Sequence, residues 1–124
     1  MRGVEPHDAS TRWDLAIVGA GAAGLATAIF AARRLPAWRI VLLDGAARPG
    51  AKILVSGGGR CNVTNRVVQA SDYNGGSPHV IRRILAAFTV DQTLAFFREI
   101  GVSLHEEPLG KMFPDSNYAR TVLD

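Results

Sequence analysis

Short apolar runs alternate with amphipathic stretches along the chain, and the first part of this pattern predicts a βαβ unit. Residues 14–18 (DLAIV) form an apolar run that ends at a glycine, which is typical of a buried parallel strand. An Ala- and Leu-rich stretch over 25–34 stops just before Pro36 and predicts a helix. A second β-branched run, 39–43 (RIVLL), predicts the next strand. This order predicts two parallel strands joined by a right-handed crossover.

The middle of the chain predicts a long loop and then two amphipathic helices. Residues 45–76 are rich in Gly, Ser, Asn and Arg and show no regular period. The sequence therefore predicts a loop of a length that is often functional in compact domains. A helix is expected over 78–88, where the apolar residues share one face. A second helix is expected from the capping-box pattern that begins at Thr89, and it should end at Gly101.

The last part of the chain predicts a β-hairpin and a further helix. Residues 102–106 and 111–113 favour two short strands around a Pro-Leu-Gly turn, and Ser116 is expected to cap a helix that continues to the final residue. The whole pattern predicts an α/β fold, a Rossmann-like βαβ unit with added helices and a small β-hairpin that together form an incomplete domain. We expect a flexible N-terminal tail over 1–12 and one truncated domain over 13–124.

Composition argues against several function classes. The 124 residues carry a net charge of +3, but the basic residues, twelve of them Arg, form no block, which argues against a nucleic-acid partner. The single cysteine, Cys61, excludes an internal disulfide, and no spaced Cys/His set predicts a metal site. The uncharged run 15–32 is rich in Ala and Gly, which favours a strand, a turn and a helix over a membrane span. No signal peptide is recognised, and we expect a cytoplasmic protein.

A glycine-rich turn lies between the first predicted strand and helix. Residues 19–24 (GAGAAG) match G-x-G-x-x-G in the strand–turn–helix context that makes this pattern specific. Gly19 permits the tight turn, Gly21 lets a pyrophosphate approach the backbone, and Gly24 lets helix and strand pack closely. The N–H groups that open the helix favour phosphate. Asp44, which follows the second strand, can accept both ribose hydroxyl hydrogens, which favours FAD or NAD over NADP.

A second glycine cluster, residues 56–65 (SGGGRCNVTN), lies in the predicted long loop. Three successive glycines can align backbone N–H groups as an anion-binding nest, and Arg60 adds a positive charge. Lys52 lies close enough along the chain to reach phosphate as well. This density of amide, hydroxyl and guanidinium groups favours a ligand-binding loop over a flexible linker.

Three motifs stand out along the chain: GAGAAG with Asp44, PGAKILVSGGGRCNVTN, and GKMFPDSNYA. Together they resemble the N-terminal segment of the BaiN/YhiN-like flavoproteins, FAD-dependent oxidoreductases of the two-dinucleotide-binding-domain superfamily. The resemblance covers about residues 12–124 and implies non-covalent FAD, because no His that could bond the flavin occurs between Gly45 and Asn74. The residues it implies at the cofactor are Gly19, Gly21, Ala22, Ala23, Gly24, Asp44, Lys52, Ser56, Gly57, Gly58, Gly59, Arg60 and Asn62.

The resemblance also implies an activity. NAD(P)H reduces FAD, and FAD passes the hydride to a small organic acceptor such as a conjugated C=C bond. Members of the family are several times longer, so we expect the chain alone to be inactive. Two positions depart from the family pattern, because Asp44 stands where Glu is usual and Lys111 stands where the G-R-x-F-P element has Arg.

Two other functions stay open at this point, an NAD-binding Rossmann module of a dehydrogenase and a dinucleotide-binding module without turnover. Cys61 is expected to be a packing residue, and His79 and His105 are expected at the surface. Glu106 and Glu107 are neighbours in a predicted strand, so they should point to opposite faces and form no acid/base pair. No residue receives a catalytic assignment, and the sequence does not define the oligomeric state.

Overall fold

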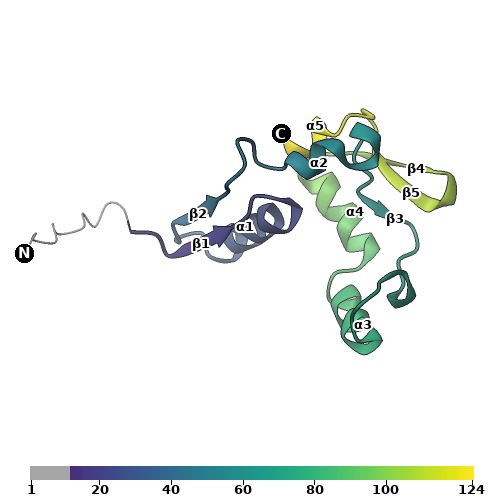
Figure 1. Cartoon of the computed structure of the whole chain (residues 1–124), viewed down its shortest axis with the longest axis horizontal. Helices are drawn as coiled ribbons and strands as arrows, with labels where there is room; N and C mark the ends of the chain where they lie inside the picture. Colours follow the sequence, from purple (N-terminus) through teal and green to yellow (C-terminus); the bar gives the residue numbers. More distant parts are fainter. Residues whose placement is uncertain (1–11) are drawn as a thin grey trace, which may run out of the picture. The chain divides into compact units, whose positions relative to one another are not determined.

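The chain divides into two units, Met1–Lys52 and Ile53–Asp124. The computed structural model of the protein describes residues 12–124 (Figure 1). Apart from Arg12, the expected N-terminal tail over 1–12 lies outside the described residues. Within residues 12–124, no helix combines the length and the apolar character that crossing a membrane requires.

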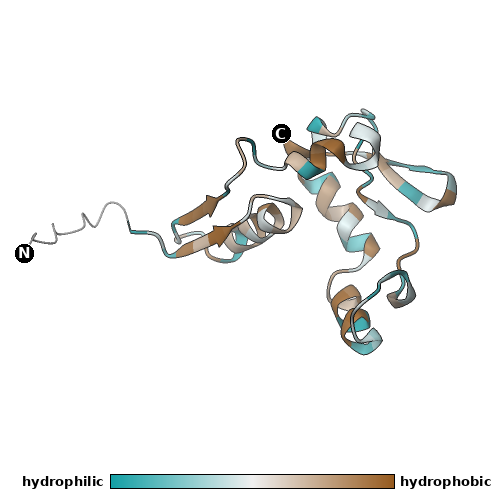
Figure 2. Cartoon of the chain, in the orientation of Figure 1, coloured by the Kyte–Doolittle hydropathy of each residue, from teal (hydrophilic) through white to brown (hydrophobic). Residues whose placement is uncertain are grey.

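The first unit contains the predicted βαβ arrangement. Strand β1 (Leu15–Val18) pairs in parallel with β2 (Ile40–Leu43), and helix α1 (Ala22–Arg34) connects them. Both strands are hydrophobic along their length (Figure 2), as their short apolar runs predict. Helix α1 begins at Ala22 and not at the predicted Leu25, because alanine is a strong helix former and the glycine turn ends earlier than expected.

The long loop predicted over 45–76 contains short elements, so this prediction is wrong in part. Helix α2 (Ala51–Val55), which crosses the boundary between the units, leads into a short turn over Ser56–Gly59 in which Gly57 and Gly58 do not have helical dihedral angles. Strand β3 (Thr64–Asn65) and a 3₁₀ turn (Ala70–Asp72) follow. These elements are too short for a sequence period to reveal, and β3 exists because it pairs with a strand far along the chain.

Two helices follow where the sequence predicts them. Helix α3 spans Pro78–Ala87, and α4 spans Val90–Glu99. The predicted capping box is present, because the Thr89 hydroxyl accepts the Gln92 N–H and the Gln92 side chain accepts the Thr89 N–H (3.3 and 2.8 Å). These reciprocal bonds satisfy two backbone donors and fix where α4 begins.

The second unit is built on a three-stranded antiparallel sheet. Strand β5 (Lys111–Pro114) lies between β3 and β4 (Leu104–Glu107), so the predicted hairpin is confirmed and gains a third strand. At the hairpin tip, Leu109 has a φ of 68° and the residue is 84% exposed. The buried residues of this unit gather on and around β5, and the apolar ones with the lowest exposure are Cys61, Val102, Met112, Phe113, Pro114 and Ala119.

The last helix, α5 (Arg120–Leu123), begins later than predicted, so the expected Ser116 cap is wrong. Asn117 takes a left-handed conformation with a φ of 52°, which interrupts helical geometry. The Ser116 hydroxyl lies 2.8 Å from the Thr121 hydroxyl and accepts the Tyr118 N–H at 3.3 Å. Ser116 therefore stabilises the turn that precedes the helix.

Candidate functional site

The glycine turn of the first unit is closed by two backbone contacts. The Gly19 N–H donates to the Leu43 carbonyl at 2.7 Å, and Gly19 has a φ of 101°, which favours glycine. A Cβ at Gly24 would overlap the Gly19 carbonyl oxygen and would come within 3.5 Å of the Leu42 side chain. The close approach that the motif predicts for Gly24 is therefore present.

The space beside Gly21 is open. Gly21 is the N-cap of α1, and a Cβ built on it would meet no atom within 4 Å. No side chain caps the helix, and its first turn contains no acidic residue. The N–H groups of Ala22 and Ala23 open the helix and have no carbonyl one turn earlier within it. This end of α1 can accept an anion, and the open backbone fits a pyrophosphate.

Asp44 lies at the carboxyl end of β2 and is bonded to the glycine turn. Its Oδ2 accepts the Ala20 N–H at 2.5 Å and its Oδ1 accepts the Ala46 N–H at 2.7 Å. These bonds, that from Ala46 first, hold the pKa of the Asp44 carboxyl below its ordinary value. The carboxylate is charged at neutral pH, and two bonds leave it capacity to accept more. The structure thus brings together Asp44 and the glycine turn, although 24 residues separate Asp44 from Ala20.

The segment after Asp44 returns to the same turn. Gly50 donates its N–H to the Ala20 carbonyl at 2.8 Å, and both residues are buried. Lys52 follows in the first turn of α2 with an exposed side chain. The bond between Gly50 and Ala20 anchors the chain that carries Lys52, and no spacing rule in the sequence predicts it.

The second glycine cluster folds into a tight left-handed loop. Gly57, Gly58 and Gly59 have φ values of 55°, 68° and 85°, which favour glycine at all three positions. The Cys61 N–H donates to the Ser56 carbonyl at 2.9 Å and closes the loop. The Ser56 hydroxyl donates to the carbonyl of Ile53, so it also stabilises the loop. Cys61 is buried, as a packing role predicts.

Arg60 is paired with Glu107. Its Nη1 and Nη2 donate to the two oxygens of the Glu107 carboxylate at 2.5 and 3.2 Å, and Nη1 also lies 3.2 Å from the Asn117 Oδ1. The guanidinium carbon lies 4.0 Å from the centre of the Phe113 ring. The hydrogen bond from Arg60 lowers the pKa of Glu107, and the same bond raises the pKa of Arg60. The sequence predicts that the positive charge of Arg60 binds an anion. In the structure, this charge is paired with the Glu107 carboxylate of the same unit.

The loop packs on the GKMFPDSNYA segment. A Cβ at Gly57 would come within 2.9 Å of the Phe113 ring and 2.5 Å of the Asn62 backbone nitrogen. The Ala119 N–H donates to the Gly59 carbonyl at 2.9 Å. Two motifs that the sequence shows separately are therefore one structural cluster. Sequence reasoning missed Glu107 in this cluster, because Arg60 lies 47 residues before it and no local pattern links the two.

His105 lies on β4 between two acidic side chains, one from the same strand and one from the residue that follows β5. His105 Nε2 lies 3.5 Å from Glu107, and Nδ1 lies 3.3 Å from Asp115. Glu106 pairs instead with Arg66 at 3.0 Å, so the two glutamates serve different partners, as predicted. No group of His, Cys, Asp or Glu within residues 12–124 is arranged to hold a metal ion.

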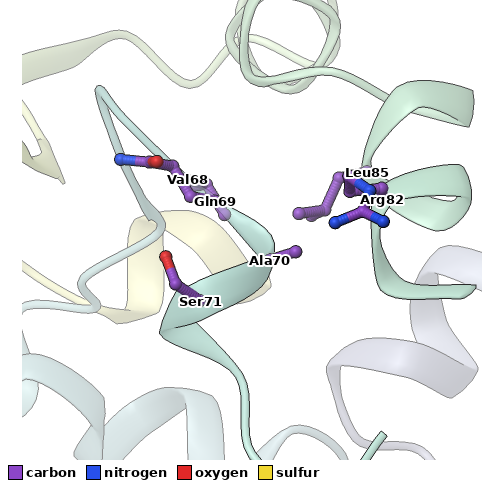
Figure 3. Close-up of a pocket in the computed structure, with 6 residues that line it drawn as sticks. All are labelled: Val68, Gln69, Ala70, Ser71, Arg82 and Leu85. Carbon is purple, nitrogen blue, oxygen red and sulfur yellow. The ribbon is translucent and has the colours of Figure 1, made fainter. Parts of the chain in front are cut away.

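The second unit also carries a groove that the sequence does not indicate. It has a volume of about 440 Å³ and lies between the 3₁₀ turn over Ala70–Asp72 and α3. The Ala70 side chain faces Arg82 and Leu85 across this groove (Figure 3). A neighbouring hollow of about 470 Å³ shares Val68 and Leu85 with it. None of the site residues expected from the sequence lines either space.

Comparisons with known proteins give three similar relatives. The chain is 39% identical over 113 residues to the ribosomal RNA dihydrouridine synthase of Escherichia coli strain K12, which covers 91% of the chain and 28% of that protein. It is 37% identical over 110 residues to the 3-dehydro-bile acid delta(4,6)-reductase of Clostridium scindens, and the match covers 89% of the chain and 27% of that protein. It is 37% identical over 106 residues to the ribosomal RNA dihydrouridine synthase of Haemophilus influenzae, and the match covers 86% of the chain and 26% of that protein. The chain thus spans about a quarter of the length of these curated relatives.

A family model gives the broader relationship. The HI0933-like protein Rossmann domain matches residues 13–124, which includes both glycine segments and the hairpin. This match confirms the resemblance to the BaiN/YhiN-like flavoproteins and the Rossmann-like fold. The chain belongs to the HI0933-like Rossmann domain family of FAD-binding flavoproteins.

Proposed function

We propose that the protein is a flavin oxidoreductase that uses NAD(P)H to reduce a carbon–carbon double bond, and that this chain supplies part of its FAD site. The observation that carries the proposal is the position of Asp44, held as a carboxylate against the glycine turn by the Ala20 N–H. Bound FAD would supply the chemistry of hydride transfer between NAD(P)H and the acceptor. The residues of this chain bind and orient the cofactor.

Each part of the glycine turn has a separate task in this proposal. The open backbone at Gly21 admits the pyrophosphate, and the N–H groups of Ala22 and Ala23 donate to it. Asp44 accepts the hydroxyl hydrogens of the adenosine ribose. We also propose that Lys52, the Ser56–Gly59 loop and Asn62 contribute to non-covalent binding of FAD. The proposed domain is 13–124, and we expect the isolated chain to turn over no substrate.

The proposed acceptor is a small molecule with a C=C bond conjugated to a carbonyl group, in a cytoplasmic protein. The names of the relatives support this class. One is a delta(4,6)-reductase of a 3-dehydro compound, and the others form dihydrouridine, which is uridine with one C=C bond reduced. In the reaction proposed for this protein, one hydride and one proton add across the double bond of the acceptor, while NAD(P)H becomes NAD(P)⁺.

A second candidate substrate is a uracil base in ribosomal RNA. Two relatives carry that activity in their names, and the chain has a net charge of +3. Against it, the basic residues form no block along the sequence. Incubating the full-length protein with NAD(P)H and either a conjugated enone or deproteinised ribosomal RNA separates the two, with loss of the C=C bond followed by mass spectrometry.

The cofactor site is tested by replacing Asp44 in the full-length protein. Asp44→Ala removes a charged acceptor of the ribose hydroxyl hydrogens, so FAD affinity should fall about ten- to a hundredfold. Asp14 provides the matched control, since its carboxylate also accepts a backbone N–H, from Arg39 at 2.9 Å, but at the opposite end of the same two strands. Asp14→Ala should leave FAD affinity unchanged. Wild-type protein that binds NAD and not FAD, or equal effects of the two variants, would contradict the proposal.

A further inference from the structure

We propose that Arg60 is a positioning residue of the FAD site, which fixes the shape of the second glycine loop through Glu107 and Phe113 and does not itself bind phosphate. The inference rests on the proposed function. It differs from the expectation that the sequence gives for this arginine, which is a positive charge presented to an anion. The contacts of the guanidinium decide between these roles.

Two surfaces of the Arg60 guanidinium are occupied within its own unit. Its edge makes a bidentate bond to Glu107, and its plane lies 4.0 Å from the centre of the Phe113 ring. The side chains of Arg60 and Glu107 are 39% and 28% exposed, so the pair is partly shielded from water. A phosphate would have to compete with a carboxylate that already neutralises the charge.

The loop before Arg60 needs such an anchor. Gly57, Gly58 and Gly59 are flexible in an unfolded chain, so holding them in one left-handed conformation has a large entropic cost. Arg60 follows them directly and ties the end of the loop to β4, while Gly57 packs against Phe113. A loop fixed before the cofactor arrives loses less entropy on binding.

The two roles predict opposite effects of replacing Glu107 on FAD affinity. Flavin titration of the full-length protein measures this affinity. If Arg60 positions the loop, Arg60→Ala and Glu107→Gln should each weaken FAD binding, about tenfold, and the double variant should be no worse than either alone. If Arg60 binds phosphate, Glu107→Gln should free it and leave FAD affinity unchanged or tighter. The second outcome overturns the proposal.

Arg60→Lys separates the roles again. Lysine keeps the positive charge but loses the bidentate edge and the planar surface, so it should weaken FAD as Arg60→Ala does. Retention of wild-type affinity by Arg60→Lys would indicate a phosphate ligand. The matched control is the Arg66–Glu106 pair, which links the residue after β3 to β4 of the same sheet, and Arg66→Ala should leave FAD affinity unchanged.

Thiol labelling provides a readout that needs no cofactor. Cys61 follows Arg60 and is buried, and its alkylation in the full-length protein is followed on the peptide that contains it by mass spectrometry. Opening the loop should expose it, so Arg60→Ala and Glu107→Gln should speed its alkylation in the absence of FAD, and Arg66→Ala should not. Unchanged labelling in the first two variants would contradict the proposal even if wild-type protein binds no FAD, whereas a failure of FAD binding with faster labelling would count only against the proposed function.

Discussion

The two glycine-rich segments of the chain use the same residue for different reasons. At Gly21, in the first unit, a Cβ would project into open space, and glycine leaves the backbone accessible. At Gly57, in the second unit, a Cβ would meet Phe113 and Asn62, and glycine lets the chain pack against itself. Gly24 belongs to the second kind although it lies in the first segment. A glycine motif therefore contains both ligand positions and packing positions, and only the neighbours of each residue distinguish them.

The sharpest way to break this comparison is to add one methyl group at Gly24 and, separately, at Gly21. Gly24→Ala places a carbon on the Gly19 carbonyl, so the turn must distort. We expect the free energy of unfolding to fall by about 3 kcal/mol and FAD binding to be lost. Gly21→Ala meets nothing, so stability should stay within about 0.5 kcal/mol of wild type while FAD affinity falls. Urea unfolding and flavin titration measure the two effects, and identical behaviour of the variants would refute the distinction.

The second unit allows the same comparison inside one loop. Gly57→Ala and Gly58→Ala both place a side chain at positive φ, which costs roughly 1–2 kcal/mol. Gly57→Ala should lose about 1–3 kcal/mol more, because its Cβ also meets Phe113 and Asn62, whereas Gly58 has nothing within 4 Å. Thermal unfolding of the two variants checks the difference. Equal losses would show that the packing of Gly57 is not what requires glycine there.

The smallest expected effect is a loss of stability at low pH. The pKa of Asp44 lies below its ordinary value of 3.8 because of backbone N–H groups, and that of Glu107 lies below 4.5 because of the Arg60 hydrogen bond. As pH falls from about 5 to 3, these two carboxyl groups take up protons in the unfolded chain before they do so in the folded protein, so the free energy of unfolding decreases. Their contribution to stability is fully present above that range. Asp44→Asn and Glu107→Gln should each flatten the dependence of unfolding free energy on pH between about 3 and 5. If unfolding free energy depends on pH as steeply in a variant as in the wild type, the bonds to that carboxylate do not stabilise the folded protein.

Sequence patterns predicted most of the regular structure and the parts of the site that depend on short-range spacing. Strands β1 and β2, the two central helices and the hairpin follow from apolar runs and a capping box. The start of helix α1 was predicted three residues too late, because the alanines that follow Gly21 already belong to the helix. The Ser116 cap was wrong, because local propensity does not reveal that Asn117 takes a left-handed conformation before α5. Element ends are decided by such tertiary detail.

The partner of Arg60 was the main omission in the site. A bidentate bond across 47 residues leaves no periodic trace, and a glutamate in a short strand resembles any exposed glutamate. The sign of a residue's charge was predictable, but the group that meets it was not. The GKMFPDSNYA segment was the available signal, since a second unusual motif in a chain with one candidate site suggests that the two segments meet.

The hairpin tip has a consequence for how the chain can change. Leu109 has a left-handed conformation that is unfavourable for leucine, and the residue is 84% exposed. Its carbonyl accepts the Asn65 side chain at 2.8 Å, so the tip is anchored through its backbone. Because any residue supplies that carbonyl, this position is open to substitution, and an asparagine, which tolerates the left-handed region, would relieve about 1 kcal/mol of strain. The hairpin tip is therefore a place where one substitution should raise the stability of the second unit.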